Sequence, residues 1–146
     1  MTATPSPASS IIVLEAYEYV HRSHQAEYEA AGGVIDGICA QAEPGMLVHA
    51  LSEVGSAGDV VTYRWLEVFQ DLQHMRAHLQ SAHVAKHVAA LQMGALALPT
   101  DLVIYGDVSA EDRAALWAEL GTDRVTFRAT VTSFYRQVEL PPNFGH

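Results

Sequence analysis

The stretch from Val60 to Val88, VVTYRWLEVFQDLQHMRAHLQSAHVAKHV, decides the fold. Its first ten residues are mostly apolar or aromatic, which predicts a buried strand over residues 60–69. Asp71 then offers a side chain for a helix N-cap, and the helical segment that follows carries four of the eight histidines. The apolar face of this segment changes direction after Ser81. We therefore expect a break there, with Ser81 capping a second helix.

The flanking segments predict the remaining elements. We expect strands over 11–20, 46–54, 102–108 and 125–138, a five-residue hairpin loop over 55–59, and an end to the histidine-rich helices at Leu98-Pro99. A helix over 21–41 should have Ser23 as N-cap and bury Ala26, Ala30, Val34 and Ile38, and a helix beginning after Ser109 should end at Gly121. Glycines 32, 33 and 37 suggest close packing or a break in the first helix.

This order predicts an α+β fold of the ferredoxin-like βαββαβ type with an added C-terminal α-β unit and an antiparallel sheet. Residues 1–10 should be a disordered N-terminal tip. Residues 11–138 should form a single domain, with a core over 11–108 and an extension over 109–138, and residues 139–146 a frayed tail. The strand over 60–69 is apolar on both faces, so we expect a homodimer in which two sheets pack together.

Charge and cysteine content limit the partners. The formal net charge is −9, which argues against nucleic acid or an anionic membrane as the main partner, since both require a basic surface. Cys39 is the single cysteine, so no intrachain disulfide can form. The N-terminus lacks the basic region of a signal peptide, and no apolar run is long enough to span a bilayer. The default expectation is a soluble cytoplasmic protein.

Three motifs together resemble a known family. Glu43-Pro44-Gly45 follows the first helix, Tyr63-Arg-Trp-Leu-Glu-Val-Phe-Gln-Asp ends the buried strand, and Ala77-His-Leu-Gln-Ser-Ala-His-Val spans the break. Over residues 11–108 this pattern resembles the antibiotic biosynthesis monooxygenase family of dimeric α/β-barrels. Glu67 and Phe69 fall on the Glu and Trp positions of the family pattern, so Phe69 departs from it. The resemblance implies a cofactor-independent oxygenase of quinols or polycyclic phenols; similar barrels include polyketide cyclases and haem-degrading enzymes.

His83 is the candidate catalytic residue. It lies two residues after the Ser81 cap, where the positive end of the helix dipole favours a neutral imidazole that can act as a base. It also falls on a position that the resemblance associates with an acid/base histidine. The alternative is a histidine that faces solvent or makes a structural hydrogen bond.

The other histidines carry weaker predictions. His74 and His78, and His83 and His87, have the i, i+4 spacing of metal ligands, but the pairs face nearly opposite ways on a continuous helix, so no metal site is predicted. His87 falls where related haem-degrading barrels carry an axial ligand, which leaves haem as an alternative cofactor. His49 alternates with Leu47 and Leu51 and is expected in the core or an interface.

Tyr63, Trp65, Glu67 and Phe69 share one face of the predicted strand. An aromatic row with one carboxylate suits the wall of a pocket for a planar phenol, or equally a dimer interface; Tyr17, Tyr19, Arg64 and Tyr105 would add to either. We expect His49, His78 and His87 to join this substrate-binding set.

The sequence has no nucleotide, flavin or nucleophile-elbow motif. It therefore favours a cofactor-free monooxygenase that deprotonates a small aromatic or polyketide-like substrate. The alternatives are a cyclase or isomerase, a haem-binding protein, or a non-catalytic dimeric ligand-binding barrel.

Overall fold

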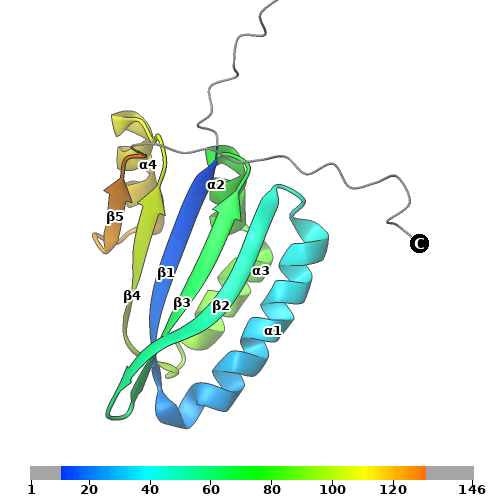
Figure 1. Cartoon of the computed structure of the whole chain (residues 1–146), viewed down its shortest axis with the longest axis vertical. Helices are drawn as coiled ribbons and strands as arrows, with labels where there is room; N and C mark the ends of the chain where they lie inside the picture. Colours follow the sequence, from blue (N-terminus) through cyan, green and yellow to red (C-terminus); the bar gives the residue numbers. More distant parts are fainter. Residues whose placement is uncertain (1–10, 131–146) are drawn as a thin grey trace, which may run out of the picture.

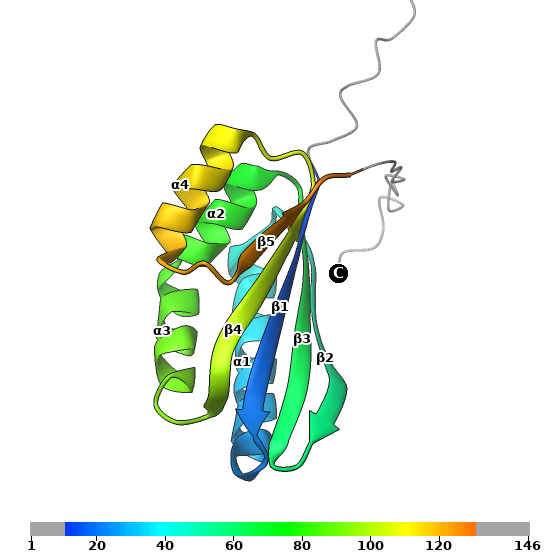
Figure 2. The same cartoon turned by 90° about the vertical axis from the view of Figure 1, so that its left-hand side faces the viewer.

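The computed structural model describes residues 11–130, which form one five-stranded sheet with helices on one of its faces (Figures 1 and 2). The strands are β1 (Ile12–His21), β2 (Met46–Ala57), β3 (Val60–Phe69), β4 (Leu96–Tyr105) and β5 (Val125–Arg128). The helices are α1 (Gln25–Ala42), α2 (Leu72–Gln80), α3 (Ala82–Leu91) and α4 (Ala110–Leu120), and a 3-10 turn, η1 (Arg22–His24), precedes α1.

The strand order is β2-β3-β1-β4-β5. The first four strands pair antiparallel, so the predicted ferredoxin-like unit is confirmed. The added strand β5 pairs parallel to β4, so the sheet is mixed and the prediction of a purely antiparallel sheet is wrong. The reason is that α4 crosses back along the sheet and lets β5 run in the direction of β4. The sheet is open rather than closed into a barrel.

Two strands are longer than predicted. β2 runs to Ala57 and turns at Gly58-Asp59, where Gly58 has a φ of 56°, so the five-residue loop is in fact a two-residue turn. β4 begins at Leu96 because α3 already ends at Leu91. Pro99 is tolerated within β4 because β5 pairs only from Leu102 onward, which leaves this part of β4 at the edge of the sheet.

Helix α1 buries a different face from the predicted one. Its buried residues are Tyr28, Gly32, Ile35 and Cys39, whereas Val34 is 64% exposed and Ile38 40% exposed. The predicted and the observed buried residues both have helical spacing. The observed face is buried because the large ring of Tyr28 packs on Tyr63. Ser23 lies in η1 and does not cap α1. At Gly32 a Cβ would lie 2.9 Å from a Leu51 methyl carbon, so close packing is confirmed there, whereas Gly33 and Gly37 have open space.

The predicted helix break is confirmed. The Asp71 side chain accepts a hydrogen bond from the backbone N–H of His74 at 2.9 Å and caps α2. The Ser81 hydroxyl accepts from the N–H of Val84 at 3.3 Å and caps α3. Ser109 caps α4 in the same way, and Gly121 ends it in the left-handed conformation, as predicted.

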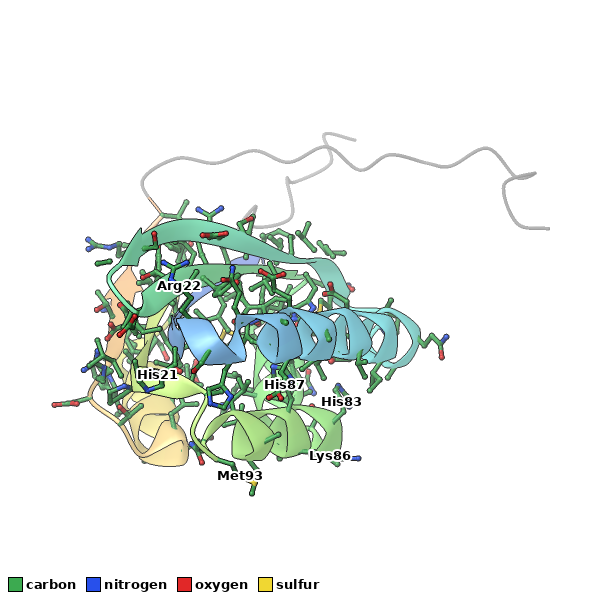
Figure 3. All side chains as sticks on the ribbon, turned by 90° about the horizontal axis from the view of Figure 1, so that it is seen from below. His21, Arg22, His83, Lys86, His87 and Met93 are labelled. Atoms are coloured by element: carbon green, nitrogen blue, oxygen red, sulfur yellow. The ribbon has the colours of Figure 1, made fainter. Side chains whose placement is uncertain are left out.

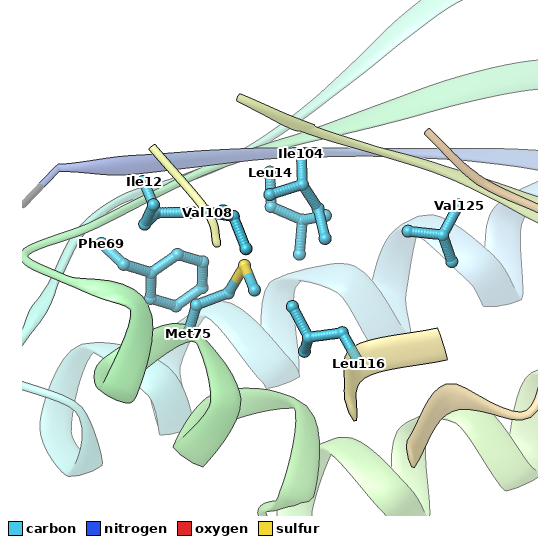
Figure 4. Close-up of a cluster of buried hydrophobic side chains, with 8 residues drawn as sticks. All are labelled: Ile12, Leu14, Phe69, Met75, Ile104, Val108, Leu116 and Val125. Atoms are coloured by element: carbon cyan, nitrogen blue, oxygen red, sulfur yellow. The ribbon is translucent and has the colours of Figure 1, made fainter. Parts of the chain in front are cut away.

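The C-terminal extension is part of the core. Val108, Leu116 and Val125 pack with Phe69, Met75 and side chains of β1 and β4 in one buried cluster (Figure 4). The extension therefore stabilises the end of the sheet near α2. The predicted N-terminal tip, residues 131–138 of the last predicted strand, and the C-terminal tail all lie outside the described residues.

Candidate active site

A cavity of about 900 Å³ lies between the sheet and helices α1 and α3. Most of its wall is apolar and comes from β1, α3 and β4. Its titratable lining residues are Glu18, His49, Glu67, His78 and His87. Pockets for small aromatic ligands have this size and this mixture of an apolar wall with a few polar groups.

Glu43 binds two histidines, His78 and His83, at one side of this cavity. It lies at the end of α1, just before Pro44-Gly45, and its carboxylate accepts hydrogen bonds from His78 Nδ1 at 2.9 Å and from His83 Nε2 at 2.7 Å. The two rings approach the same carboxylate because the chain bends at Ser81. His78 and His83, one from each predicted pair, therefore face the same carboxylate, whereas His74 contacts Asp71.

The Glu43 carboxylate is ionised in this setting. Burial disfavours its charge, but hydrogen bonds from His83 and His78 outweigh burial and hold the pKa of Glu43 below its usual value. Burial, together with the Glu43 carboxylate, raises the pKa of the neighbouring Cys39 to about 12. Cys39 is buried and protonated, and it is not a reactive thiol.

Glu67 is the carboxyl group on the cavity side of His78. It is buried on β3, and burial, with the charges of Glu18 and Glu43, raises its pKa to about 8. Glu67 Oε2 lies 3.3 Å from His78 Nε2 without an aligned hydrogen bond to any described residue. Burial also lowers the pKa of His78. Near neutral pH the pair is therefore a protonated carboxyl beside a neutral imidazole.

His49 links the same cavity to the surface of α1. Its Nδ1 lies 2.5 Å from Asp36 Oδ1, and its ring stacks on Trp65 with 4.3 Å between ring centroids. Its Nε2 is 3.7 Å from Glu67 Oε1, too far for a direct hydrogen bond. Burial lowers the pKa of His49 despite the nearby Asp36. The predicted polar partner is present, but His49 is half-buried, and Leu47, expected to be buried on the same face, is 54% exposed.

His87 differs from His83 although both belong to α3. Both lie on the side of α3 that faces α1, whereas Lys86 and Met93 point outward (Figure 3). His87 lines the cavity, and its Nε2 is buried with no hydrogen-bond partner among residues 11–130. Burial lowers its pKa. His83 does not line the cavity, and it reaches the cavity only through Glu43 and His78.

The predicted aromatic row is only partly at the cavity. Tyr63, Trp65, Glu67 and Phe69 do share the helix-facing side of β3, but only Trp65 and Glu67 line the cavity. The Tyr63 hydroxyl donates to Glu29 at 2.6 Å, and Phe69 lies in the core cluster of Figure 4. On the opposite, uncovered face of the sheet, Tyr17 and Arg64 contact Glu15, Tyr105 lies beside Glu15, and Tyr19 donates to Asp101.

Sequence reasoning missed three acidic residues of this site. Glu43 was part of a motif but was not predicted to bind histidines, and Asp36 gave no signal. Glu18 did give one, because it lies on the same face of β1 as Leu14, Ala16 and Val20. Burial of an acidic residue on an otherwise apolar face costs free energy unless the carboxyl is paired or hydrogen-bonded, so such a residue is a candidate for a functional role.

Two groups of side chains have donor atoms suited to a transition metal. Within residues 11–130, the first group is Cys39, Glu43, His78 and His83, and the second is His49, Glu67 and His78. The donor atoms of each group lie within 4.8 Å of one another. In the first group, hydrogen bonds already join the imidazoles to the carboxylate.

These observations agree with a comparison with known families. The family model described as antibiotic biosynthesis monooxygenase matches residues 11–90, more than half of the chain. The chain belongs to the antibiotic biosynthesis monooxygenase family. The matched region contains β1, α1, β2, β3, α2 and nearly all of α3, and so it includes Glu18, Glu43, Glu67 and the cavity histidines. Membership supports a general monooxygenase-like role.

Solved structures share the fold at low sequence identity. MupZ from Pseudomonas fluorescens is 20% identical with a TM-score of 0.66, and the match covers 92% of this chain and 96% of MupZ. A Caulobacter crescentus protein provisionally assigned as an antibiotic biosynthesis monooxygenase is 20% identical with a TM-score of 0.61, covering 70% of this chain and 93% of its own. No curated protein matches the sequence.

The helices of the described region leave no candidate for a membrane span, because none combines sufficient length with sufficient hydrophobicity.

Proposed function

We propose that this protein is a cofactor-free monooxygenase that oxidises a small phenolic, quinol or polyketide-like aromatic compound with a histidine as base. The observation that carries this proposal is the cavity of about 900 Å³ whose apolar wall ends at an acid/base cluster of Glu67, His78 and His49. Trp65 lies in the wall beside this cluster and offers an aromatic surface to a planar ligand.

The tautomer of His78 follows from its contacts. Glu43 is a carboxylate and can only accept, so His78 donates from Nδ1 and carries its lone pair on Nε2. That lone pair points to the side of Glu67 and the cavity. In our proposal Nε2 takes the substrate proton, and Glu43 stabilises the resulting imidazolium, as a carboxylate does for a histidine base in other enzymes.

His83 is the second donor to Glu43. Its Nε2 lies 2.7 Å from the same carboxylate, and its side chain is 20% exposed. We propose that this N–H holds the Glu43 carboxylate in place and keeps it ionised beside the imidazolium that forms on His78. His83 is thus proposed to act through Glu43, whereas His78 is proposed to touch the substrate and to return its proton to the oxygen atom that leaves as water.

Deprotonation makes the substrate react with dioxygen. For an aromatic ketone with an acidic CH₂ group, such as anthrone, loss of a proton gives an electron-rich phenolate-type anion. This anion is oxidised by O₂; one oxygen atom becomes the new carbonyl, and the other leaves as water with the two hydrogens of the CH₂ group. All four electrons that reduce O₂ come from the CH₂ carbon, which is oxidised to the carbonyl carbon.

The test is oxygen uptake with anthrone and 1,4-naphthoquinol as probes. The wild-type protein should consume O₂ and incorporate one ¹⁸O atom from ¹⁸O₂ into the product. His78→Ala should abolish turnover, and His83→Ala should reduce it strongly while leaving the circular dichroism spectrum unchanged. His74→Ala is the matched control, because His74 contacts Asp71 and does not line the cavity. An unchanged rate in both His78→Ala and His83→Ala would refute the proposal.

A cyclase or isomerase would use the same proton abstraction without oxygen. Conversion of a probe with no O₂ uptake, still dependent on His78, would favour that alternative. A barrel that binds aromatic ligands without turnover would bind the probes and leave them unchanged.

Haem binding is a second candidate because His87 presents a buried, unpartnered Nε2 in the described part of the cavity. The lining contains no Lys or Arg within residues 11–130, so the two haem propionates would have to reach solvent. A Soret band after haem titration that disappears in His87→Ala would support this candidate.

We also propose that the uncovered face of the sheet binds a second copy of the chain. On β3 this face carries Val60, Thr62, Arg64, Leu66 and Val68, all only half-exposed, and Val48 on β2 adds an apolar side chain that is 40% exposed. Sheet-on-sheet packing would cover these side chains. Light scattering should give the mass of a dimer for the wild type and of a monomer for Val68→Asp. A monomeric wild type would refute this part.

A further inference from the structure

Glu18 is a buried acidic residue that has no role in the proposed mechanism. It lies on β1 with its side chain on the helix side of the sheet, and it lines the cavity. Only 7% of the residue is exposed, and its Oε2 atom has no hydrogen-bond partner among residues 11–130. The Tyr28 hydroxyl lies beside this carboxyl but makes no aligned hydrogen bond to it. A buried carboxyl oxygen without a hydrogen bond costs free energy, so a ligand that supplies the missing bond would recover it.

Glu18 and Glu67 lie at different points along the cavity wall. In the sheet, Leu14 of β1 is opposite Glu67 of β3, and Glu18 lies four residues further along β1, opposite Tyr63. Four residues of a strand span ~13 Å between Cα atoms, and the two carboxyl groups are close enough for the charge of Glu18 to act on Glu67. Between the two acids lie Ala16 and Trp65, which are opposite each other and are apolar. A ligand that reaches both acids is therefore elongated, with an apolar middle.

The lining also limits the charge of the ligand. Among the described residues, no Lys or Arg lines the cavity, so a ligand carboxylate or phosphate would find no positive partner. Burial raises the pKa of Glu18 to about 7, although the Tyr28 hydroxyl acts in the opposite direction. With a proton, Glu18 can donate a hydrogen bond to a ligand oxygen as well as accept one.

We propose that Glu18 forms a second polar subsite, which binds a hydroxyl or carbonyl oxygen at the far end of an elongated, uncharged aromatic substrate. This inference rests on the proposed function for the other end of the cavity, where the reacting group lies beside Glu67 and His78. It narrows the substrate class to planar compounds with an oxygen function at both ends.

The test measures binding rather than turnover, by calorimetry with 4,4′-dihydroxybiphenyl and 4-hydroxybiphenyl. The wild type should bind the diol about tenfold more tightly, which corresponds to one hydrogen bond to a buried partner. Glu18→Leu should lose this preference while its affinity for 4-hydroxybiphenyl is unchanged. Glu18→Gln retains hydrogen-bonding atoms of similar size and should keep part of the preference.

Glu15→Gln is the matched control. Glu15 is also a nearly buried acid of β1, but it lies on the uncovered face of the sheet and does not line the cavity. This variant should retain the wild-type preference for the diol. The same preference in Glu18→Leu would overturn the inference, as would failure of the wild type to bind either probe.

Two charged probes test the ligand class. Biphenyl-4-carboxylate should bind at least tenfold more weakly than 4-hydroxybiphenyl, because its charge would be buried without a positive partner among the described lining residues. Binding of 4-(aminomethyl)biphenyl more tightly than the diol would overturn the assignment to uncharged ligands. If Glu18→Leu removes the diol preference but His78→Ala leaves binding and turnover unchanged, the subsite stands and the proposed function fails.

Discussion

His83 and His78 share one oxygen atom of Glu43: His83 Nε2 lies 2.7 Å from Glu43 Oε2, and His78 Nδ1 lies 2.9 Å from the same atom. One carboxylate at the end of α1 thus connects a partly exposed imidazole to a buried one. A single side chain therefore determines both the orientation of two histidines and the tautomer of the one that faces the ligand.

Removal of Glu43 should be costly. Glu43→Ala leaves two imidazole N–H groups without their acceptor, and we expect a loss of ~2–4 kcal/mol in the free energy of unfolding. Glu43→Gln can still accept from one histidine, so its loss should be about half as large. Urea denaturation measures both. Glu53→Gln, on the exposed part of β2, is the control and should change stability by less than ~0.5 kcal/mol.

Stability should depend on pH through Glu67 and Glu18. Their pKa values are raised to about 8 and about 7 from 4.5, so the folded state holds these protons more tightly than the unfolded state. The free energy of unfolding should therefore fall as pH rises from about 5 to about 8. The lowered pKa values of His49, His78 and His87 act in the opposite sense and reduce stability as pH falls below about 6.5.

The carboxyl contribution can be isolated by subtraction. The side chains of the double variant Glu18→Gln/Glu67→Gln cannot ionise. Its free energy of unfolding, relative to that of the wild type, should therefore increase steadily between pH 5 and pH 8. Chemical denaturation at several pH values measures this difference. A difference that stays constant over this range would show that the two carboxyls ionise normally in the folded protein.

The three glycines of α1 should respond differently to alanine. Gly33 and Gly37 have open space around a new Cβ, so Gly33→Ala and Gly37→Ala should stabilise the protein by ~0.5–1 kcal/mol through helix propensity. At Gly32 the Cβ would lie 2.9 Å from a Leu51 methyl carbon, which must shift, so Gly32→Ala should gain less stability than Gly33→Ala by ~1 kcal/mol. Thermal denaturation of the three variants provides the comparison. Equal effects at Gly32 and Gly33 would contradict the close approach of α1 to β3.

The cap at Ser81 should matter for the site as well as for stability. Ser81 accepts from the Val84 N–H and donates to the His78 carbonyl at 2.7 Å, so it fixes the angle between α2 and α3. Ser81→Ala should cost ~1 kcal/mol and also shift the imidazole NMR signals of His78 and His83. Ser109→Ala removes the equivalent cap of α4, far from these histidines, and should cost about as much without moving their signals.

Periodicity and capping residues predict much of this fold because they act locally. Asp71, Ser81 and Ser109 each satisfy a helix N–H with a side chain close in sequence, and all three predictions are confirmed. The buried face of α1 was predicted wrongly because two stripes have the same helical spacing. Only packing against Tyr63, Leu51 and Trp65 distinguishes them.

The site was harder to predict because it depends on contacts across the fold. Trp65 and Glu67 have a visible pattern on β3, and the histidines have one on α2 and α3. The meeting of His78 and His83 at Glu43, however, requires the tertiary bend at Ser81 together with the end of α1. The distances between these residues in sequence carry no information about that meeting. The direction of β5 likewise depends on how α4 packs rather than on the strand itself.

Strand β5 also changes how the protein can associate with other chains. In a four-stranded sheet the whole outer edge of β4 would offer free backbone groups for strand addition, the step by which fibres grow. Here β5 occupies Leu102–Tyr105, and the remaining edge contains Pro99, which has no N–H to donate. Within residues 11–130, the outer strands are now β2, with 12 residues, and β5, with only 4. A further strand would add most readily to the longer edge, so solubility at high concentration should depend on β2 rather than on β4.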